Sequence, residues 1–170
     1  MKLRNLKRRL YGLTTLPERV SRVRYFRGHG VHSPFVYQLV RQAFMRREVV
    51  TCEPVLYEAL RERGFPLKRA VQLQNLYTHC RYHSFSIDAL DNPCDLCVVS
   101  EKSNGETTRE LVERAARRHT TVVLLSPYEG RNRAAMCREI VENHGCTSVD
   151  KRAFLVLFSD PKLPKQHYRI

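Results

Sequence analysis

Apolar residues in the first half of the chain recur every three or four positions, which is the period of amphipathic helices. Leucines at this spacing over residues 3–13 predict a first helix, which Leu16-Pro17 ends. Ser33-Pro34 suits the start of a second helix, with serine as the cap and proline in the first turn, and an apolar face follows over residues 35–44. Similar signals predict two further helices, over residues 54–64 and 66–82.

From Ser84 the pattern changes to short apolar runs, which are typical of strands buried on both faces of a sheet. The segment Ser103-Asn104-Gly105-Glu106 matches a capping box and predicts a helix behind it. The link over residues 150–152 is too short for a parallel crossover, which needs about a dozen residues, so it predicts an antiparallel hairpin. We expect strands at 84–90, 95–100, 120–126, 147–150 and 153–159, with a second helix of this half at 131–144.

This order of elements predicts an α/β fold, a shortened doubly wound sheet with a closing antiparallel strand pair. A helical N-terminal region precedes it. We divide the chain into a basic N-terminal arm at residues 1–30, a helical region at 31–83 and an α/β domain at 84–170. The length of 170 residues leaves no room for two full catalytic domains.

The charge is unevenly distributed along the chain. Residues 1–47 contain twelve lysines and arginines but only one acidic residue, Glu18, and so supply most of the net charge of +13. A basic segment of this kind attracts anions, so we expect an anionic partner or nucleic acid to bind through residues 1–47. A homo-oligomer is a further alternative.

The sequence predicts a cytoplasmic protein. It has no apolar run near the roughly 20 residues that a spanning helix needs, and its basic N-terminus is not followed by the apolar stretch of a secretory signal. The six cysteines are therefore interpreted as reduced thiols. Cys94 and Cys97 are three residues apart, an offset that points side chains of a strand to opposite faces, so we expect buried thiols and no metal site.

Two groups of residues are candidates for binding. Arg27, His29, His32 and Ser33 precede the helix that begins at Pro34, where they could contact an anion or a substrate. The alternative is an ordinary loop whose histidines cap or pack against neighbouring helices. Two acids, Glu101 and Glu129, follow the predicted strands at 95–100 and 120–126 and could meet in a cleft at the strand ends.

Three segments carry a resemblance to a known family. Residues 29–36 read His-Gly-Val-His-Ser-Pro-Phe-Val, the strand at 95–99 reads Asp-Leu-Cys-Val-Val, and residues 165–170 read Lys-Gln-His-Tyr-Arg-Ile. They resemble bacterial, mainly Bacteroidetes-type, class I S-adenosylmethionine-dependent methyltransferases. The resemblance implies a Rossmann-like methyltransferase sheet and covers about the first 45 and the last 80 residues.

The chain departs from this family where the cofactor would bind. No Glu-x-Gly-x-x-x-Gly turn and no acid for the ribose occur between Phe65 and Asp95, and Ser100 and Ser126 stand where the family has acids. We therefore expect a degenerate methyltransferase-like protein with a binding or scaffolding role, no bound cofactor and no assignable catalytic residue. The alternatives are an active methyltransferase that binds S-adenosylmethionine in a rearranged pocket, and a basic nucleic-acid-binding protein.

Overall fold

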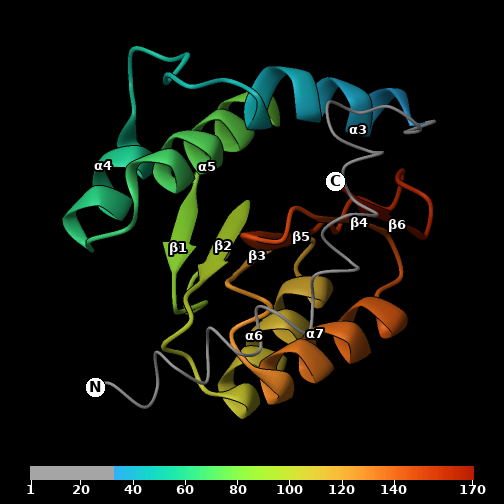
Figure 1. Ribbon diagram of the computed structural model, residues 1–170. Coiled ribbons are helices and arrows are strands. Elements are labelled where there is room, and N and C mark those ends of the chain that lie inside the picture. Colours follow the sequence, from blue (N-terminus) through green and yellow to red (C-terminus); the bar gives the residue numbers. More distant parts are fainter. Residues whose placement is uncertain (1–32) are drawn as a thin grey trace.

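A six-stranded mixed sheet lies between two layers of helices in the computed structural model, which describes residues 33–170 (Figure 1). The strand order is β1-β2-β3-β5-β4-β6. β1, β2 and β3 are parallel, β5 is antiparallel to both β3 and β4, and β6 is parallel to β4. The strands are β1 (Phe85–Ile87), β2 (Leu96–Val99), β3 (Thr121–Leu125), β4 (Thr147–Asp150), β5 (Phe154–Leu157) and β6 (Gln166–Arg169).

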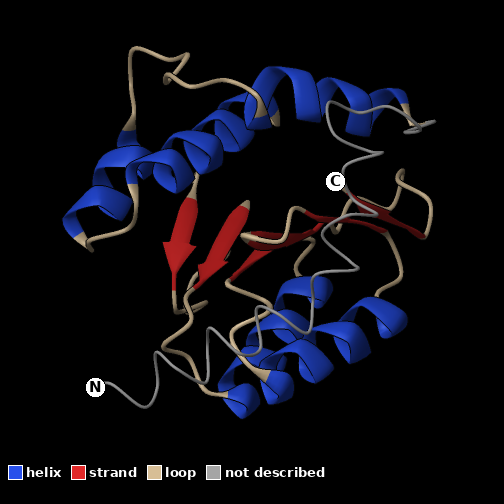
Figure 2. Cartoon of the chain, in the orientation of Figure 1, coloured by secondary structure: helices blue, strands red, loops and turns tan. Residues whose placement is uncertain are grey.

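The two helical layers cover opposite faces of the sheet, and Figure 2 shows them on either side of the strands. One layer comes from the helical region that precedes the sheet: α3 (Pro34–Leu39), its π-helical continuation (Val40–Phe44), α4 (Val55–Glu62) and α5 (Leu67–His79). The other consists of α6 (Gly105–Arg117) and α7 (Arg131–Asn143), which connect β2 to β3 and β3 to β4. No helix in the described part of the chain is long and apolar enough to cross a membrane.

Successive side chains of each strand point to opposite faces of the sheet, so the strands contribute to a hydrophobic core on each face. Val98, Val123 and Val156 pack with α3, α4 and α5, whereas Cys97, Val122 and Leu155 pack with α6 and α7. Every residue of β2, β3, β4 and β5 is buried, as expected for strands covered on both faces. The predicted α/β fold with helices on both faces of its sheet is confirmed, and so is the closing antiparallel hairpin of β4 and β5.

The caps predicted for the helices are confirmed in one case and wrong in another. Ser33 caps α3, because its hydroxyl accepts a hydrogen bond from Val36 N at 3.3 Å, and Pro34 lies in the first turn. α6 begins one residue later than the capping box predicts: its cap is Asn104, whose Oδ1 accepts from Thr107 N at 2.8 Å. The Ser103 hydroxyl instead donates to Asp88 Oδ1.

Two strands differ from the prediction. β1 ends after Ile87, because Asp88 adopts a left-handed conformation with φ of 59° that leaves the strand. β6 was not expected, since its side chains are polar and mostly exposed, and it forms by backbone pairing to β4. The helix predicted over residues 3–13 and the arm at 1–30 lie outside the described residues.

Candidate functional site

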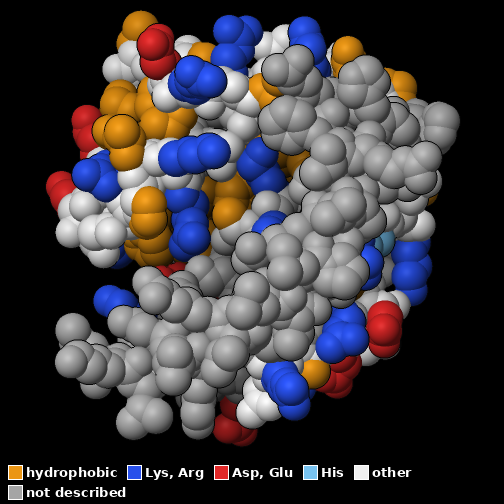
Figure 3. All heavy atoms as spheres, in the orientation of Figure 1, with side chains coloured by type: hydrophobic (Ala, Val, Ile, Leu, Met, Phe, Trp, Pro, Cys, Tyr) orange, Lys and Arg blue, Asp and Glu red, His pale blue; other side chains and the backbone are white. Residues whose placement is uncertain are grey.

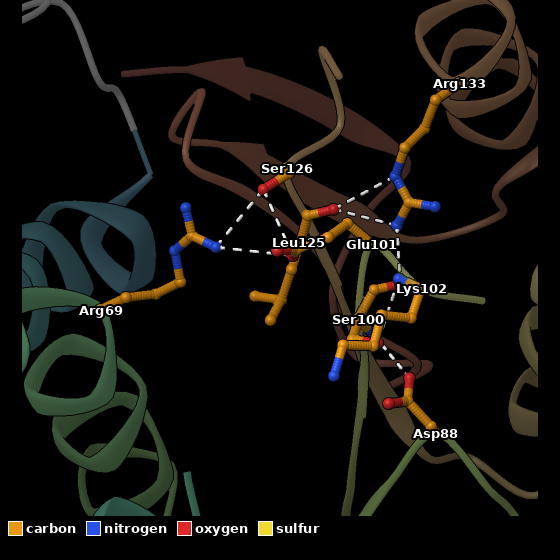
Figure 4. Close-up of polar contacts among 8 residues, drawn as sticks. All are labelled: Arg69, Asp88, Ser100, Glu101, Lys102, Leu125, Ser126 and Arg133. Atoms are coloured by element: carbon orange, nitrogen blue, oxygen red, sulfur yellow. Dashed lines mark hydrogen bonds and ion pairs between the residues drawn. The ribbon is translucent and has the colours of Figure 1, made fainter. Parts of the chain in front are cut away.

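The carboxyl ends of β1, β2 and β3 meet at one edge of the sheet, which we call the carboxyl edge. In open α/β sheets ligands bind outside this edge. Here the chain places Asp88 after β1, Ser100 and Glu101 after β2, and Ser126 after β3 (Figure 4).

Arg69 joins the helical layer to the carboxyl edge. It lies in the first turn of α5, and its Nη1 is 3.3 Å from Ser126 Oγ and 3.8 Å from Glu101 Oε2. The Ser126 hydroxyl also lies 3.5 Å from Glu101 Oε2, so the three side chains form one polar group between α5 and the strand ends. Ser126 has a φ of 48°, a left-handed conformation that turns the chain away from β3.

Asp88 closes the gap between the ends of β1 and β2. Its Oδ1 accepts hydrogen bonds from Ser100 N at 2.6 Å and from Ser103 Oγ at 3.0 Å. The Asp88 side chain thus takes up the backbone donor at the end of β2. The contact is therefore internal to the protein.

Arg133 occupies the carbonyl ends of β2 and β3 from the opposite helical layer. Its Nη2 donates to Leu125 O at 2.9 Å and to Ser100 O at 3.2 Å, and its Nε donates to Leu125 O at 3.2 Å. Its acceptors are neutral carbonyls, so its charge is not cancelled by the groups it binds. Arg133 orients the two strand ends and the loops that follow them.

The two predicted cleft acids both lie next to Ser126. Glu101 contacts the Ser126 hydroxyl and Arg69, and the backbone N–H of Glu129 donates to Ser126 O at 3.0 Å. Arg69 was missed by sequence reasoning, because it is 57 residues from its serine partner and no local motif connects them.

Of the four residues before α3 that were predicted to bind an anion, only Ser33 lies in the part of the chain that the structure describes. Its hydroxyl is used as the cap of α3. Arg27, His29 and His32 lie outside the described residues, so their arrangement around Ser33 is still a prediction.

Lys151, in the hairpin between β4 and β5, is a second residue that the sequence did not single out. Its ammonium lies 5.1 Å from the centroid of the Phe44 ring. Burial, together with the nearby charge of Lys68, lowers the pKa of Lys151 from 10.5 to about 8. Lys68 and Arg69 both belong to the first turn of α5, and Figure 3 shows lysine and arginine side chains around apolar ones over α4 and α5.

The cysteines of the structure are free thiols. All six lie in the described part of the chain and none forms a disulfide. Cys97 is buried, its Sγ lies 3.5 Å from Ala89 O, and burial raises its pKa to about 11, which makes it a poor nucleophile. Over residues 33–170 no three His, Cys, Asp or Glu side chains are grouped so as to hold a metal ion.

One cavity lies away from the carboxyl edge, on the surface of α6 and α7. It has a volume of about 220 Å³ and is lined by residues that include Val112, Ile140 and His144. An ion pair between Arg109 and Glu139, 2.7 Å long, belongs to its lining. His144 Nε2 lies 2.8 Å from Phe158 O, and burial lowers the pKa of this histidine. The imidazole therefore has a structural partner.

Comparison with models of protein families, with curated proteins and with solved structures finds no match to this chain.

Proposed function

We propose that this chain is a methyltransferase-like α/β protein that binds a ligand or partner and does not transfer methyl groups. The resemblance of residues 29–36, 95–99 and 165–170 supports the first part. The α/β topology, with helices on both faces of the sheet and a closing antiparallel pair of β4 and β5, is compatible with a sheet of that kind.

The residues at the carboxyl edge do not fit S-adenosylmethionine as that family would hold it. A Gly-rich turn after β1 is needed for the backbone to approach the cofactor closely, but β1 passes directly into Asp88, Ala89 and Leu90, and Leu90 is buried. The glycines of residues 33–170 lie at helix ends, with Gly64 after α4 and Gly130 before α7.

A single observation carries the non-catalytic proposal. The acid after β1 is Asp88, and its carboxylate is used by Ser100 N and Ser103 Oγ. Binding the ribose hydroxyls of a cofactor through Asp88 would leave the buried end of β2 without its partner, at a cost of about 1–3 kcal/mol. The edge is thus built to hold its own loops together.

Calorimetric titration with S-adenosylmethionine and with S-adenosylhomocysteine tests this proposal. We expect no saturable heat up to about 1 mM, the upper end of ordinary Michaelis constants. A cooperative urea transition in the same preparation is the control for a folded protein. Saturable binding in the micromolar range would overturn the proposal and favour the active methyltransferase with a rearranged pocket.

Nucleic-acid binding is a second candidate, supported by three exposed arginines, Arg41 in the π-helical segment and Arg46 and Arg47 in the loop that leads to α4. Phosphate neutralisation makes such binding fall steeply with salt. Anisotropy of a labelled single-stranded RNA at about 50 and 200 mM salt measures it, with Arg41, Arg46 and Arg47 changed together to alanine as the test variant. Binding that is absent or independent of salt counts against this candidate.

A further inference from the structure

The cavity on the surface of α6 and α7 has the properties of a docking groove for a helix. Val112 and Ala116 of α6 and Ile140 of α7 give it an apolar lining, and its volume is about 220 Å³. This volume is below the roughly 300–1,000 Å³ of usual small-molecule pockets, which favours inserted side chains over a separate ligand.

We propose that residues 1–13 of the same chain, the leucine segment, dock in this groove as an amphipathic helix. The segment has leucines three or four positions apart, which a helix places on one face: Leu3, Leu6, Leu10 and Leu13. Amphipathic helices bind apolar grooves through anchors at this spacing. The stripe has no tryptophan or phenylalanine, the anchors of a helix on a membrane surface, so its composition favours a protein groove.

The described part of the chain begins close to this groove. Phe35, two residues after Ser33, packs edge-on against Phe158 with ring centroids 5.1 Å apart. The backbone carbonyl oxygen of Phe158 lies 2.8 Å from Nε2 of His144, and His144 lines the groove. Residues 14–32 span up to about 60 Å when extended, so they allow the leucine segment to reach the groove. The tether also raises the local concentration of the segment at the groove.

The charges of the groove and of the leucine segment are complementary. Two glutamates, Glu113 and Glu139, line the groove together with one arginine, Arg109. Arg109 pairs with Glu139, whereas Glu113 forms no ion pair within the described part of the chain. The leucine segment contains five lysines and arginines and no acid. The unpaired carboxylate of Glu113 therefore attracts the basic side chains that flank the leucine stripe.

The helical layer is the other place where a leucine stripe could pack, because it exposes apolar side chains such as Val55 and Leu67. Lysine and arginine side chains surround the apolar ones over α4 and α5, as Figure 3 shows. Their charge would repel a basic segment. The groove of α6 and α7 is therefore the better match in both apolar surface and charge.

Hydrogen exchange of the full chain, followed by mass spectrometry, tests the docking. A helix of this length is marginal in water by itself, so we expect docking to slow the exchange of amides 3–13 at least about tenfold relative to a free peptide. Ala116→Trp fills the groove from an exposed position and should remove this protection. Leu6→Asp should remove it as well. Asn5→Asp adds the same charge on the opposite predicted face and should keep it.

A second pair of variants tests the contribution of charge. Glu113→Lys should lower the protection of residues 3–13 about threefold, the scale of one exposed charge contact. Glu110→Lys makes the same change at an exposed position of α6 outside the groove and should have no effect. If Ala116→Trp does not fold in a urea titration, the comparison of Glu113→Lys with Glu110→Lys decides the test.

Protection of residues 3–13 that neither Ala116→Trp nor Glu113→Lys changes would place the segment elsewhere and overturn the proposal. Free exchange of these amides in the wild type would also overturn it. Protection that is lost on about tenfold dilution would assign the groove to the segment of a second copy. A zero-length carbodiimide cross-link from Lys2 or Lys7 to Glu113 should form in the wild type and be lost in Leu6→Asp; its formation in both would count against docking through the leucines.

Discussion

Asn75 of α5 holds the loop before α4 through Val50. Its Oδ1 accepts a hydrogen bond from Val50 N at 3.1 Å, and its Nδ2 donates to Glu48 O at 2.9 Å. Asn75 is fully buried, so one side-chain amide satisfies two backbone groups that have no strand or helix partner. The same helix uses Gln72 and Gln74 in the same way, for Phe44 O and Tyr57 N.

Replacing Asn75 should therefore destabilise the protein. Asn75→Leu removes both hydrogen bonds of this buried amide and takes the protein partner from Val50 N and Glu48 O, so we expect a loss of about 1–3 kcal/mol in the free energy of unfolding measured in urea. Asn132→Leu, on the exposed face of α7, is the matched control and should change stability by less than about 0.5 kcal/mol. Equal effects of the two variants would contradict the role given to Asn75.

Tyr82 connects the end of the helical layer to the start of β3. Its hydroxyl lies 2.6 Å from Thr121 Oγ1, and its ring packs edge-on against Tyr77 with centroids 6.3 Å apart. Tyr82→Phe keeps the ring and removes the hydroxyl, so we expect a loss of about 1–2 kcal/mol in equilibrium unfolding. Tyr37→Phe, at an exposed position of α3, should be neutral. Combining Tyr82→Phe with Thr121→Val should recover part of the loss, because both partners are then apolar; a fully additive loss would argue against this bond.

The elements that the sequence predicts well are those whose local pattern and tertiary environment agree. The strands Leu96–Val99 and Thr121–Leu125 are apolar throughout and are buried on both faces. α5 is different, because it is buried on nearly all sides although Gln72, Gln74 and Asn75 are polar. Their burial depends on backbone groups 17 to 28 residues away, at the end of the π-helical segment, in the loop after it and in the first turn of α4, which periodicity cannot show.

The candidate site was predicted only in part, for a related reason. Ser100, Glu101 and Ser126 follow from the rule that loops after parallel strands meet at one edge. Arg69 and Lys151 do not, because their positions depend on how α5 packs across the sheet and how the hairpin of β4 and β5 turns. The early end of β1 could not be predicted from the local sequence either, because the left-handed conformation of Asp88 is stabilised by partners 12 and 15 residues later.

Asp88 should contribute to stability through both its conformation and its hydrogen bonds. Asp88→Ala removes the acceptor for Ser100 N and places alanine in a left-handed conformation, so we expect a loss of about 2–3 kcal/mol in urea unfolding. Asp88→Asn retains an acceptor oxygen and tolerates this conformation, and should lose less than about 1 kcal/mol. If Asp88→Asn is as destabilising as Asp88→Ala, the negative charge itself is what the site needs.

Lys151 should make the stability of the protein depend on pH in the alkaline range. The pKa of Lys151 is about 8 in the folded protein and 10.5 in the unfolded chain, because burial in the folded state disfavours the charged ammonium. Below pH 8 Lys151 is protonated in both the folded and the unfolded state, so the full cost of burying the ammonium lowers the stability. Between pH 8 and 10.5 only the unfolded state holds the proton, so this cost falls and the stability rises with pH. At pH 7 Lys151→Met should therefore be more stable than wild type, by about 1–2 kcal/mol once partial exposure is allowed for.

That advantage of Lys151→Met should shrink as the pH is raised, with a slope of at most about 1.4 kcal/mol per pH unit, and vanish near pH 10.5. The comparison has to be a difference between the two proteins, because Cys97 and Cys137 titrate in the same range. Burial raises the pKa of both thiols to about 11, so they lower stability as pH rises, equally in wild type and variant. The nearby charge of Lys68 in α5 also lowers the pKa of Lys151, and Lys68 is present in both proteins. Urea unfolding at pH 7, 8, 9 and 10 measures the effect, and a difference between wild type and Lys151→Met that does not change with pH would show that the ammonium is not buried as described.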